Sequence, residues 1–246
     1  MSCFHPISVD QTRRDSLQSL IRRLGLEDLD SPSLLLEVER ALTHTSSGRT
    51  DHNERLEFLG DAVLRLAATL YLDRHYPGLT VGDSSSLRAQ LVSDRWLAEL
   101  GEAIDIESCL ILGVKALGDA AARTTIRADA TEALIGALYK VSGSLDPILV
   151  WLTPHWQRTS AAVLAAPHRF NGKTTLQEWS QGQGLGLPEY STEERSQVHG
   201  DPQRFRSTVR VASKVLAEGH GRSRKEAEQN AAIAAAQTFA GNAAPH

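Results

Sequence analysis

The segment from Asn53 to His75 constrains this 246-residue chain most, because it places acidic side chains within a largely apolar helical pattern. Apolar residues surround Glu57 and Asp61 on nearly every side of the helix, which predicts a buried helix. Glu57 and Asp61 are four residues apart and share one face, and Glu54 lies one turn earlier. Acid pairs at this spacing are usually solvated. On a buried helix, however, ionised carboxylates are costly unless they are paired or bound to a cation.

A second predicted helix, from Thr125 to Tyr139, carries the same unusual combination. Asp129 and Glu132 are three residues apart among alanine, leucine and isoleucine, and Gly136 predicts a close approach of another helix. We expect the two helices to cross and to bring their four acids together, with no lysine or arginine on those faces. Four like charges need a counter-charge, and ligands that are all oxygen favour Mg²⁺, with Mn²⁺ as the other possibility. Such a site suits phosphate chemistry.

The remaining pattern predicts two domains. Residues 8–164 are expected to be all-α, residues 165–171 to form a linker, and residues 172–241 to form a small α+β domain of order α-β-β-β-α, with an antiparallel sheet and both helices on one face. From Asn171 onward the chain carries 9 Lys and Arg against 8 Asp and Glu, whereas the preceding part carries 17 against 22. The acid excess therefore lies in the helical part. Further helices are expected after Ser31-Pro32, over 83–100 and over 144–164.

Composition places the chain among globular proteins. It is 41% hydrophobic and 23% charged, without an apolar run long enough to span a bilayer and without a secretory signal pattern near Met1. Its two cysteines, Cys3 and Cys109, have no metal or redox spacing. We expect reduced thiols and a cytoplasmic protein that does not enter a membrane.

The acid-bearing segments resemble the ribonuclease III family. NERLEFLGDAVL at 53–64 is similar to the family signature, and DATEALIGALY at 129–139 is similar to its second acidic motif; ALTH at 41–44 and LRAQLV at 87–92 also agree. The resemblance implies an all-α ribonuclease III domain that hydrolyses phosphodiester bonds of double-stranded RNA. It also implies 5′-phosphate and 3′-hydroxyl ends with short 3′ overhangs, and ribosomal RNA precursors and structured messenger RNA as substrates.

The resemblance also assigns residues. Glu57, Asp129 and Glu132 would hold the metal, Asp61 would act directly or through a metal-bound water, and loss of Glu132 would harm the chemistry most. Family members act as homodimers, and Phe58 matches the position that enters a cavity of the partner subunit; the alternative for Phe58 is a core aromatic residue.

One position departs from the family pattern. Val81 stands where an acid is common just before Gly82-Asp83, so any supporting role of that acid is absent. Glu54, its partner in the family, is retained.

The C-terminal part resembles a double-stranded RNA-binding domain. The sequence GHGRSRKEAE at 219–228 is similar to the loop and second-helix start of that module, so Ser223, Arg224 and Lys225 are expected to contact phosphates. The alternative is a capped surface helix with ordinary basic residues.

Two further regions of this module are expected to contact RNA. Gln177 and Glu178 match positions that face the minor groove. A histidine usually stands four residues before Phe205, where this chain has Asp201. Either this contact is weakened, or His199 replaces the histidine after a loop shift.

Two other functions remain open. A non-catalytic double-stranded RNA-binding or ribosome-associated protein would be expected to have lost some of the four acids. A metal phosphohydrolase acting on small nucleotides would leave the C-terminal domain without a function.

Overall fold

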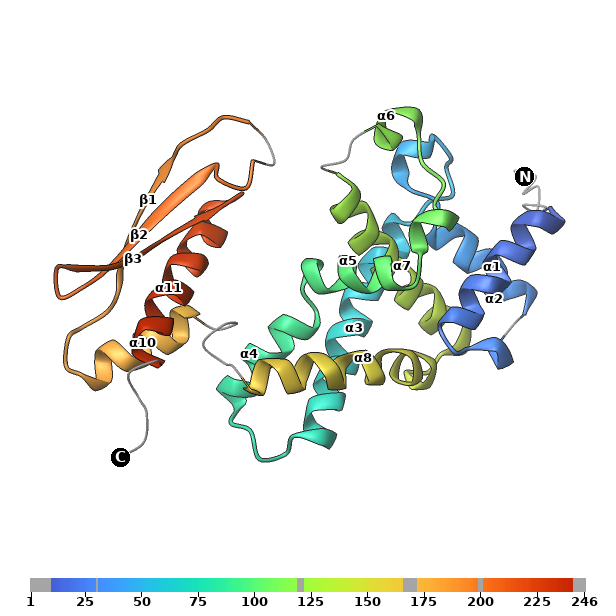
Figure 1. The fold of residues 1–246 in the computed structure, drawn as a ribbon. Helices are drawn as coiled ribbons and strands as arrows, with labels where there is room; N and C mark the ends of the chain where they lie inside the picture. Colours follow the sequence, from blue (N-terminus) through green and yellow to red (C-terminus); the bar gives the residue numbers. More distant parts are fainter. Residues whose placement is uncertain (1–9, 30, 119–121, 166–171, 199–200, 241–246) are drawn as a thin grey trace. The chain divides into compact units, whose positions relative to one another are not determined.

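The structure, a computed structural model, describes residues 10–29, 31–118, 122–165, 172–198 and 201–240. It divides into two compact units, residues 1–160 and 161–246, called here the helical domain and the C-terminal domain (Figure 1). Within the described residues no helix is long and apolar enough to cross a membrane. The longer elements of the helical domain are α1 (Gln11–Arg23), α2 (Pro32–Ala41), α3 (Glu54–His75), α4 (Val81–Leu91), α5 (Asp94–Ala103), α7 (Arg123–Ser142) and α8 (Asp146–Ala165), which extends past residue 160 into the second unit.

Side-chain caps explain where several of these helices begin. Ser31 accepts a hydrogen bond from the backbone N–H of Leu34 at 3.2 Å, directly before Pro32, which confirms the predicted start of α2. Thr80 caps α4 in the same way through the N–H of Asp83 at 3.1 Å. Short helical turns connect these helices: η1 (Glu27–Leu29), η2 (Thr45–Ser47), η3 (Ile106–Cys109) and α6 (Val114–Leu117).

The single helix predicted over 83–100 is wrong, because this stretch forms two helices. α4 ends at Leu91, and Ser93 caps a new helix, α5, by accepting a hydrogen bond from the N–H of Trp96 at 3.2 Å. A serine at an N-cap satisfies backbone donors that a continuous helix would satisfy internally. The break gives α5 its own direction and places Asp94 at its first position.

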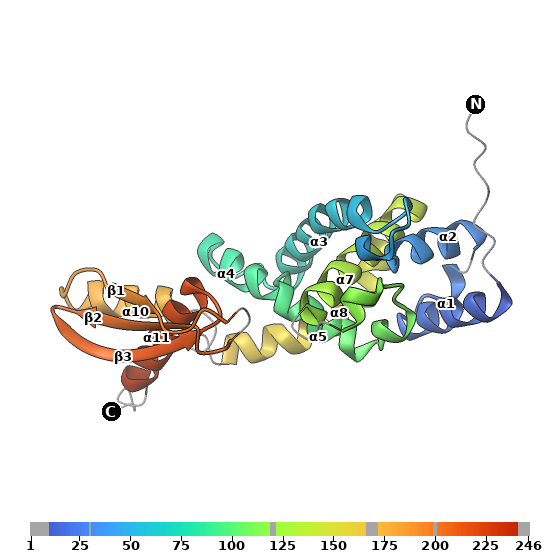
Figure 2. The same cartoon turned by 90° about the horizontal axis from the view of Figure 1, so that it is seen from above.

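Helices α3 and α7 form the centre of the helical domain and lie against each other (Figure 2). A Cβ atom at Gly60 would collide with the main-chain carbonyl of Glu132, and one at Gly136 would collide with that of Leu56. The two helices therefore touch main chain to main chain, which only glycine permits at these two positions. The close approach predicted at Gly136 is confirmed.

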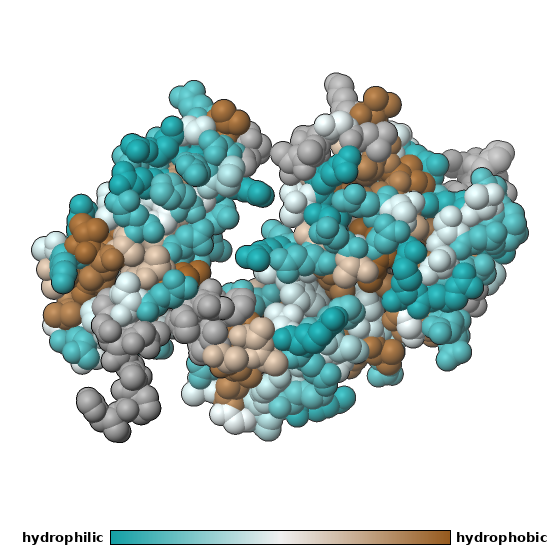
Figure 3. Space-filling model, in the orientation of Figure 1, coloured by the Kyte–Doolittle hydropathy of each residue, from teal (hydrophilic) through white to brown (hydrophobic). Residues whose placement is uncertain are grey.

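The prediction that α3 is a buried helix is correct for one face only. One face packs in the core through Leu56, Val63 and Leu64, whereas Phe58 is 85% exposed and Leu66 51% exposed on another. Hydrophobic side chains also interrupt the largely hydrophilic surface in the view of Figure 3. Apolar residues on every side of a helix predict that each face is packed against something. They do not say whether that is the core of the same chain or the surface of another chain.

The C-terminal domain has the predicted α-β-β-β-α order, and both its helices pack on one face of the sheet (Figures 1 and 2). Leu176, Val209 and Ala232 belong to its core. The inward positions of the second strand alternate with outward ones, as the sequence predicts. The elements are α10 (Gly172–Gly182), β1 (Glu189–Glu194), β2 (Phe205–Val211), β3 (Lys214–Gly221) and α11 (Arg224–Ala240), with antiparallel strands in the order β1-β2-β3.

The predicted linker lies almost wholly outside the described residues, since only Ala165, the last residue of α8, is described.

Candidate active site

The crossing of α3 and α7 brings the four predicted acids to one region. α3 carries Glu57 and Asp61 on either side of Gly60, and α7 carries Asp129 and Glu132. The main chain of Glu132 lies against Gly60, so the two helices present their acids at the point of closest approach. All four carboxylate residues are half-buried.

The charges of these acids act on one another. Burial, followed by repulsion from Asp61, Glu57, Asp94 and Asp129, raises the pKa of Glu132 to about 7. Burial also raises the pKa of Glu57, and the charge of Asp129 adds to the effect. The predicted convergence of the two acid pairs is therefore present as an electrostatic cluster, centred on Glu132.

Sequence reasoning missed Asp94 and His44 in this neighbourhood. Asp94, the first residue of α5, adds negative charge near both Glu132 and Asp129. His44 lies near Asp129: burial raises the pKa of Asp129, and His44 opposes that rise. The Nδ1 atom of His44 is 2.8 Å from the hydroxyl of Ser46.

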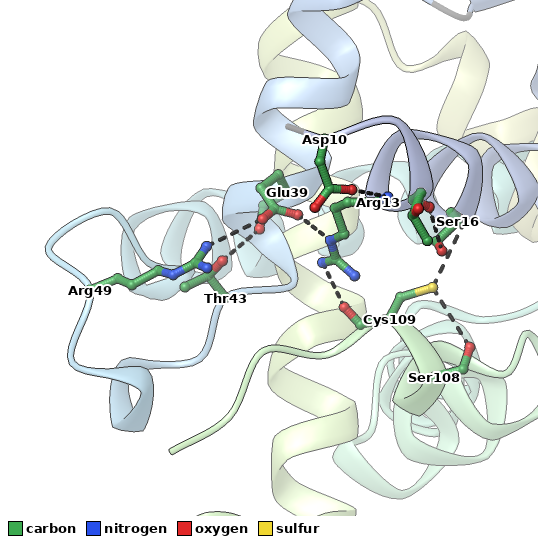
Figure 4. A network of polar contacts seen from close by, with 9 residues as sticks. Asp10, Arg13, Ser16, Glu39, Thr43, Arg49, Ser108 and Cys109 are labelled. Carbon is green, nitrogen blue, oxygen red and sulfur yellow. Dashed lines mark hydrogen bonds and ion pairs between the residues drawn. The ribbon is translucent and has the colours of Figure 1, made fainter. Parts of the chain in front are cut away.

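A network of polar contacts fixes the segment that carries His44 (Figure 4). The carboxylate of Glu39, on α2, is almost fully buried and pairs with Arg13 at 2.7 Å and Arg49 at 3.3 Å. The Thr43 hydroxyl donates to the Glu39 carbonyl at 2.8 Å, and Arg13 also donates to the carbonyl of Cys109 at 2.7 Å. Since α1, α2, the loop before α3 and η3 all meet here, His44 is held in place beside the acids.

The expectation that no arginine lies on the acidic faces is wrong. Arg65 follows Asp61 by four residues on α3, and its Nε atom donates to both carboxylate oxygens of Asp61 at 2.9 and 3.0 Å. The i, i+4 spacing that predicts a shared face for Glu57 and Asp61 predicts one for Asp61 and Arg65 as well.

The donors available here fit a hard divalent cation. The cluster offers carboxylate oxygens, and burial and mutual repulsion make its full ionisation unfavourable without added positive charge. Among the described residues, no three His, Cys, Asp or Glu side chains are arranged to hold a metal ion as they stand.

We predict that the metal-free protein becomes less stable as the pH rises from about 4.5 to about 7. A carboxyl whose pKa is higher in the folded chain than in the unfolded chain stabilises the fold below the unfolded value, and this contribution is lost as the pH passes the folded value. For Glu132 these values are 4.5 and about 7. Thermal unfolding with a chelator, at steps across this range, should show a steeper decline for the parent than for Glu132→Gln. Equal slopes would contradict the prediction.

The C-terminal domain presents the predicted RNA-contacting residues as follows. Ser223 caps α11 by accepting a hydrogen bond from the N–H of Glu226 at 3.2 Å, and Arg224 donates to the Thr192 carbonyl at 3.2 Å. Gln177, Glu178, Ser223, Arg224 and Lys225 are all exposed.

Two residues in the loop before β2 were expected to differ from the module's pattern. His199 lies outside the described residues. Asp201 accepts a hydrogen bond from the N–H of Gln203 at 2.8 Å and so stabilises a turn.

The other positions singled out on the helical domain are exposed. Val81 begins α4 and is exposed, and Glu54 is the exposed first residue of α3. Phe58 is also exposed, which rules out the alternative that it is a core aromatic residue.

Comparisons with known proteins agree with this arrangement. Residues 35–146 match the family profile described as Ribonuclease-III-like, and residues 173–238 match the one described as double-stranded RNA binding motif. A protein named Ribonuclease 3 from Prochlorococcus marinus is 48% identical over 231 residues, which cover 91% of this chain and 93% of that relative. Ribonuclease 3 from Gloeobacter violaceus is 42% identical over 236 residues, 94% of this chain and 92% of that relative. The chain therefore belongs to the ribonuclease III family of endoribonucleases.

Proposed function

We propose that this chain cleaves double-stranded RNA by metal-dependent hydrolysis of its phosphodiester bonds. The observation that supports this most directly is the electrostatic cluster at the α3–α7 crossing, where burial and like charges raise the pKa of Glu132 to about 7. A half-buried group of carboxylates is suited to a site that is completed by a cation and a phosphate. A small-nucleotide hydrolase would give the C-terminal domain, which matches a double-stranded RNA binding motif, no function.

Glu57, Asp129 and Glu132 would hold the metal, with Mg²⁺ preferred and Mn²⁺ able to replace it. A bound divalent cation supplies positive charge to the phosphoryl oxygen and lowers the pKa of water. Asp61, one turn after Glu57, would orient the attacking water or receive its proton. Hydrolysis in this sense leaves a 5′-phosphate and a 3′-hydroxyl.

The C-terminal domain would hold the RNA duplex by its shape. The N-terminus of α11, with Ser223, Arg224 and Lys225 beside it, would present the positive end of the helix dipole to a phosphate. Gln177 and Glu178 would reach the minor groove from the exposed side of α10, and His199 would contribute from the loop before β2. Because phosphate contacts release counterions, binding should weaken steeply as salt increases. We propose ribosomal RNA precursors and structured messenger RNA in the cytoplasm as the substrates, since both contain long duplexes.

Digestion of a long RNA duplex with mapping of the product ends tests this function. With Mg²⁺ we expect 5′-phosphate ends and short 3′ overhangs, and with a chelator we expect none of these products. Binding of the duplex without cleavage, in Mg²⁺ and in Mn²⁺, would instead support a non-catalytic RNA-binding role.

We further propose that the active form is a homodimer joined through the exposed face of α3. Phe58, Leu66 and Leu70 are 85%, 51% and 43% exposed, an apolar surface for which a second copy is the proposed partner. Phe58 also borders a groove of about 1080 Å³ that is lined in part by His52 and Arg55. In a two-fold dimer each surface meets its own copy, so the Phe58 ring of each chain would enter the groove of the other. Two sites so related would cut the two strands at staggered positions.

Phe58→Ala is expected to raise the dimer dissociation constant by roughly 10³-fold, because the dimer loses two buried aromatic rings and each typically contributes about 2 kcal/mol. Sedimentation velocity over a dilution series would measure it. Val150→Ala, which alters a side chain 60% exposed on α8, is the matched control and should stay within about threefold. A monomeric parent, or equal effects of the two variants, would contradict the proposed interface.

A further inference from the structure

Arg65 forms a close ion pair with one of the four acids. Its Nε atom donates to both oxygens of Asp61, and its Nη2 atom lies 2.8 Å from Oδ1 of the same carboxylate. Arginine offers several N–H groups in one plane, so a single guanidinium can engage both carboxylate oxygens. In this structure the Asp61 carboxylate therefore points to Arg65.

The Arg65 charge also reaches the rest of the cluster. Hydrogen bonding to Asp61 and the charge of Asp61 raise the pKa of Arg65, and the charges of Glu132 and Asp94 raise it further. These residues come from α3, α7 and α5, so Arg65 lies on the side of α3 that faces the acids. It supplies positive charge to a cluster that needs it.

The ion pair between Arg65 and Asp61 can be broken at a small cost in free energy. The side chains of Arg65 and Asp61 are 60% and 43% exposed, and exposed ion pairs are worth little because water solvates both partners once they separate. A divalent cation held by Glu57, Asp129 and Glu132 would repel the guanidinium. The attacking water that Asp61 is proposed to orient would use the same Asp61 oxygen lone pairs that now accept from Arg65. Binding of the cation and of the water that Asp61 orients therefore competes with the ion pair between Arg65 and Asp61.

We propose that Arg65 is an exchangeable internal counter-ion, which holds Asp61 in the metal-free protein and is released when a divalent cation binds the cluster. This inference rests on the proposed metal-dependent function. It gives Arg65 a positioning role, because the residue acts through Asp61. The apparent affinity for the cation is then lowered by the free energy needed to displace Arg65 from Asp61.

Titration calorimetry of the full-length, metal-free protein with Mn²⁺ tests the proposal without RNA and without turnover. Arg65→Gln should bind Mn²⁺ about four- to 25-fold more tightly than the parent, since loss of the competing pair and of cation repulsion each change an equilibrium constant by roughly two- to fivefold. Arg65→Lys keeps the charge at the same place and should stay within about twofold of the parent. Arg74→Gln is the matched control: it removes the same charge nine residues further along α3, about 14 Å away, and should also leave the affinity unchanged.

A second measurement separates this competition from a change in folding. Added salt screens exposed charges, so the difference between Arg65→Gln and the parent should shrink at 1 M NaCl, while circular dichroism should stay the same for both. If the parent binds Mn²⁺ and Arg65→Gln binds with equal or lower affinity, the counter-ion role is wrong and the proposed function is unaffected. If neither protein binds Mn²⁺, the proposed metal-dependent function fails, and this inference fails with it.

Discussion

Glu132→Gln is expected to slow cleavage of duplex RNA by roughly 10³-fold or more, the scale of losing a group on which the chemical step depends. Glu132 is the centre of the acid cluster, because four other acids act on its pKa. Glutamine has nearly the same shape but cannot ionise, so it removes a charged oxygen ligand and leaves the α3–α7 contact in place. Single-turnover cleavage at saturating protein would measure the chemical step.

Duplex binding by Glu132→Gln should remain within about twofold of the parent, because phosphate contacts supply most of the affinity and the C-terminal domain is unchanged. Glu99→Gln, which alters an exposed acid paired with Arg95 on α5, is the matched control and should cleave at the parent rate. If Glu132→Gln cleaves as fast as this control, the acid cluster is not the site of hydrolysis.

Gly60→Ala is expected to destabilise the helical domain by about 3 kcal/mol or more, at the upper end of what overpacking of a core costs. The added methyl group would collide with the main-chain carbonyl of Glu132. A backbone cannot move aside as a flexible side chain can, so α3 and α7 would have to separate. Urea unfolding would measure the stability, and cleavage by the fraction that remains folded should also fall, because the acids move apart with the helices.

Gly82→Ala provides the comparison for this substitution. Gly82 also lies in a helix, α4, but the nearest atom to its added Cβ would be the Thr80 hydroxyl at 3.7 Å, an ordinary contact. We expect no loss, or a gain of about 0.5–1 kcal/mol from the better helix propensity of alanine. Similar effects of the two substitutions would mean that the α3–α7 contact is not tight.

The sequence predicted the helices and the acids because both leave local signals. Apolar periodicity and the paired acids on α3 and α7 indicated the crossing, and Gly136 indicated its closeness. The sequence did not identify Gly60 as a contact point, because a glycine between two motif acids does not indicate which part of the chain packs against it. The partner atom belongs to Glu132, 72 residues further along the chain.

Arg65 and Asp94 were missed for different reasons. Arg65 could have been found, because its spacing from Asp61 is the same spacing that linked Asp61 to Glu57. Asp94 was hidden by the prediction of one continuous helix: only the break at Ser93, which starts α5, brings Asp94 towards Glu132. Its position depends on tertiary structure, which spacing along the chain does not specify.

The sequence pattern could not predict that one face of α3 is exposed. A helical wheel reports that Phe58 and Leu66 are apolar, but burial in the chain's own core and burial against another chain produce the same pattern. The structure separates the two cases by leaving these side chains exposed.

The contact between α3 and α7 has a consequence for how this domain can change. Its tightest point is peptide group against peptide group, so the separation of the two acid-bearing helices is set by atoms that every amino acid possesses. The surrounding aliphatic residues can be exchanged for others of similar volume without altering that separation. Most substitutions in the core would therefore leave the distance between the acid-bearing helices unchanged. Substitution of Gly60 or Gly136 would change it.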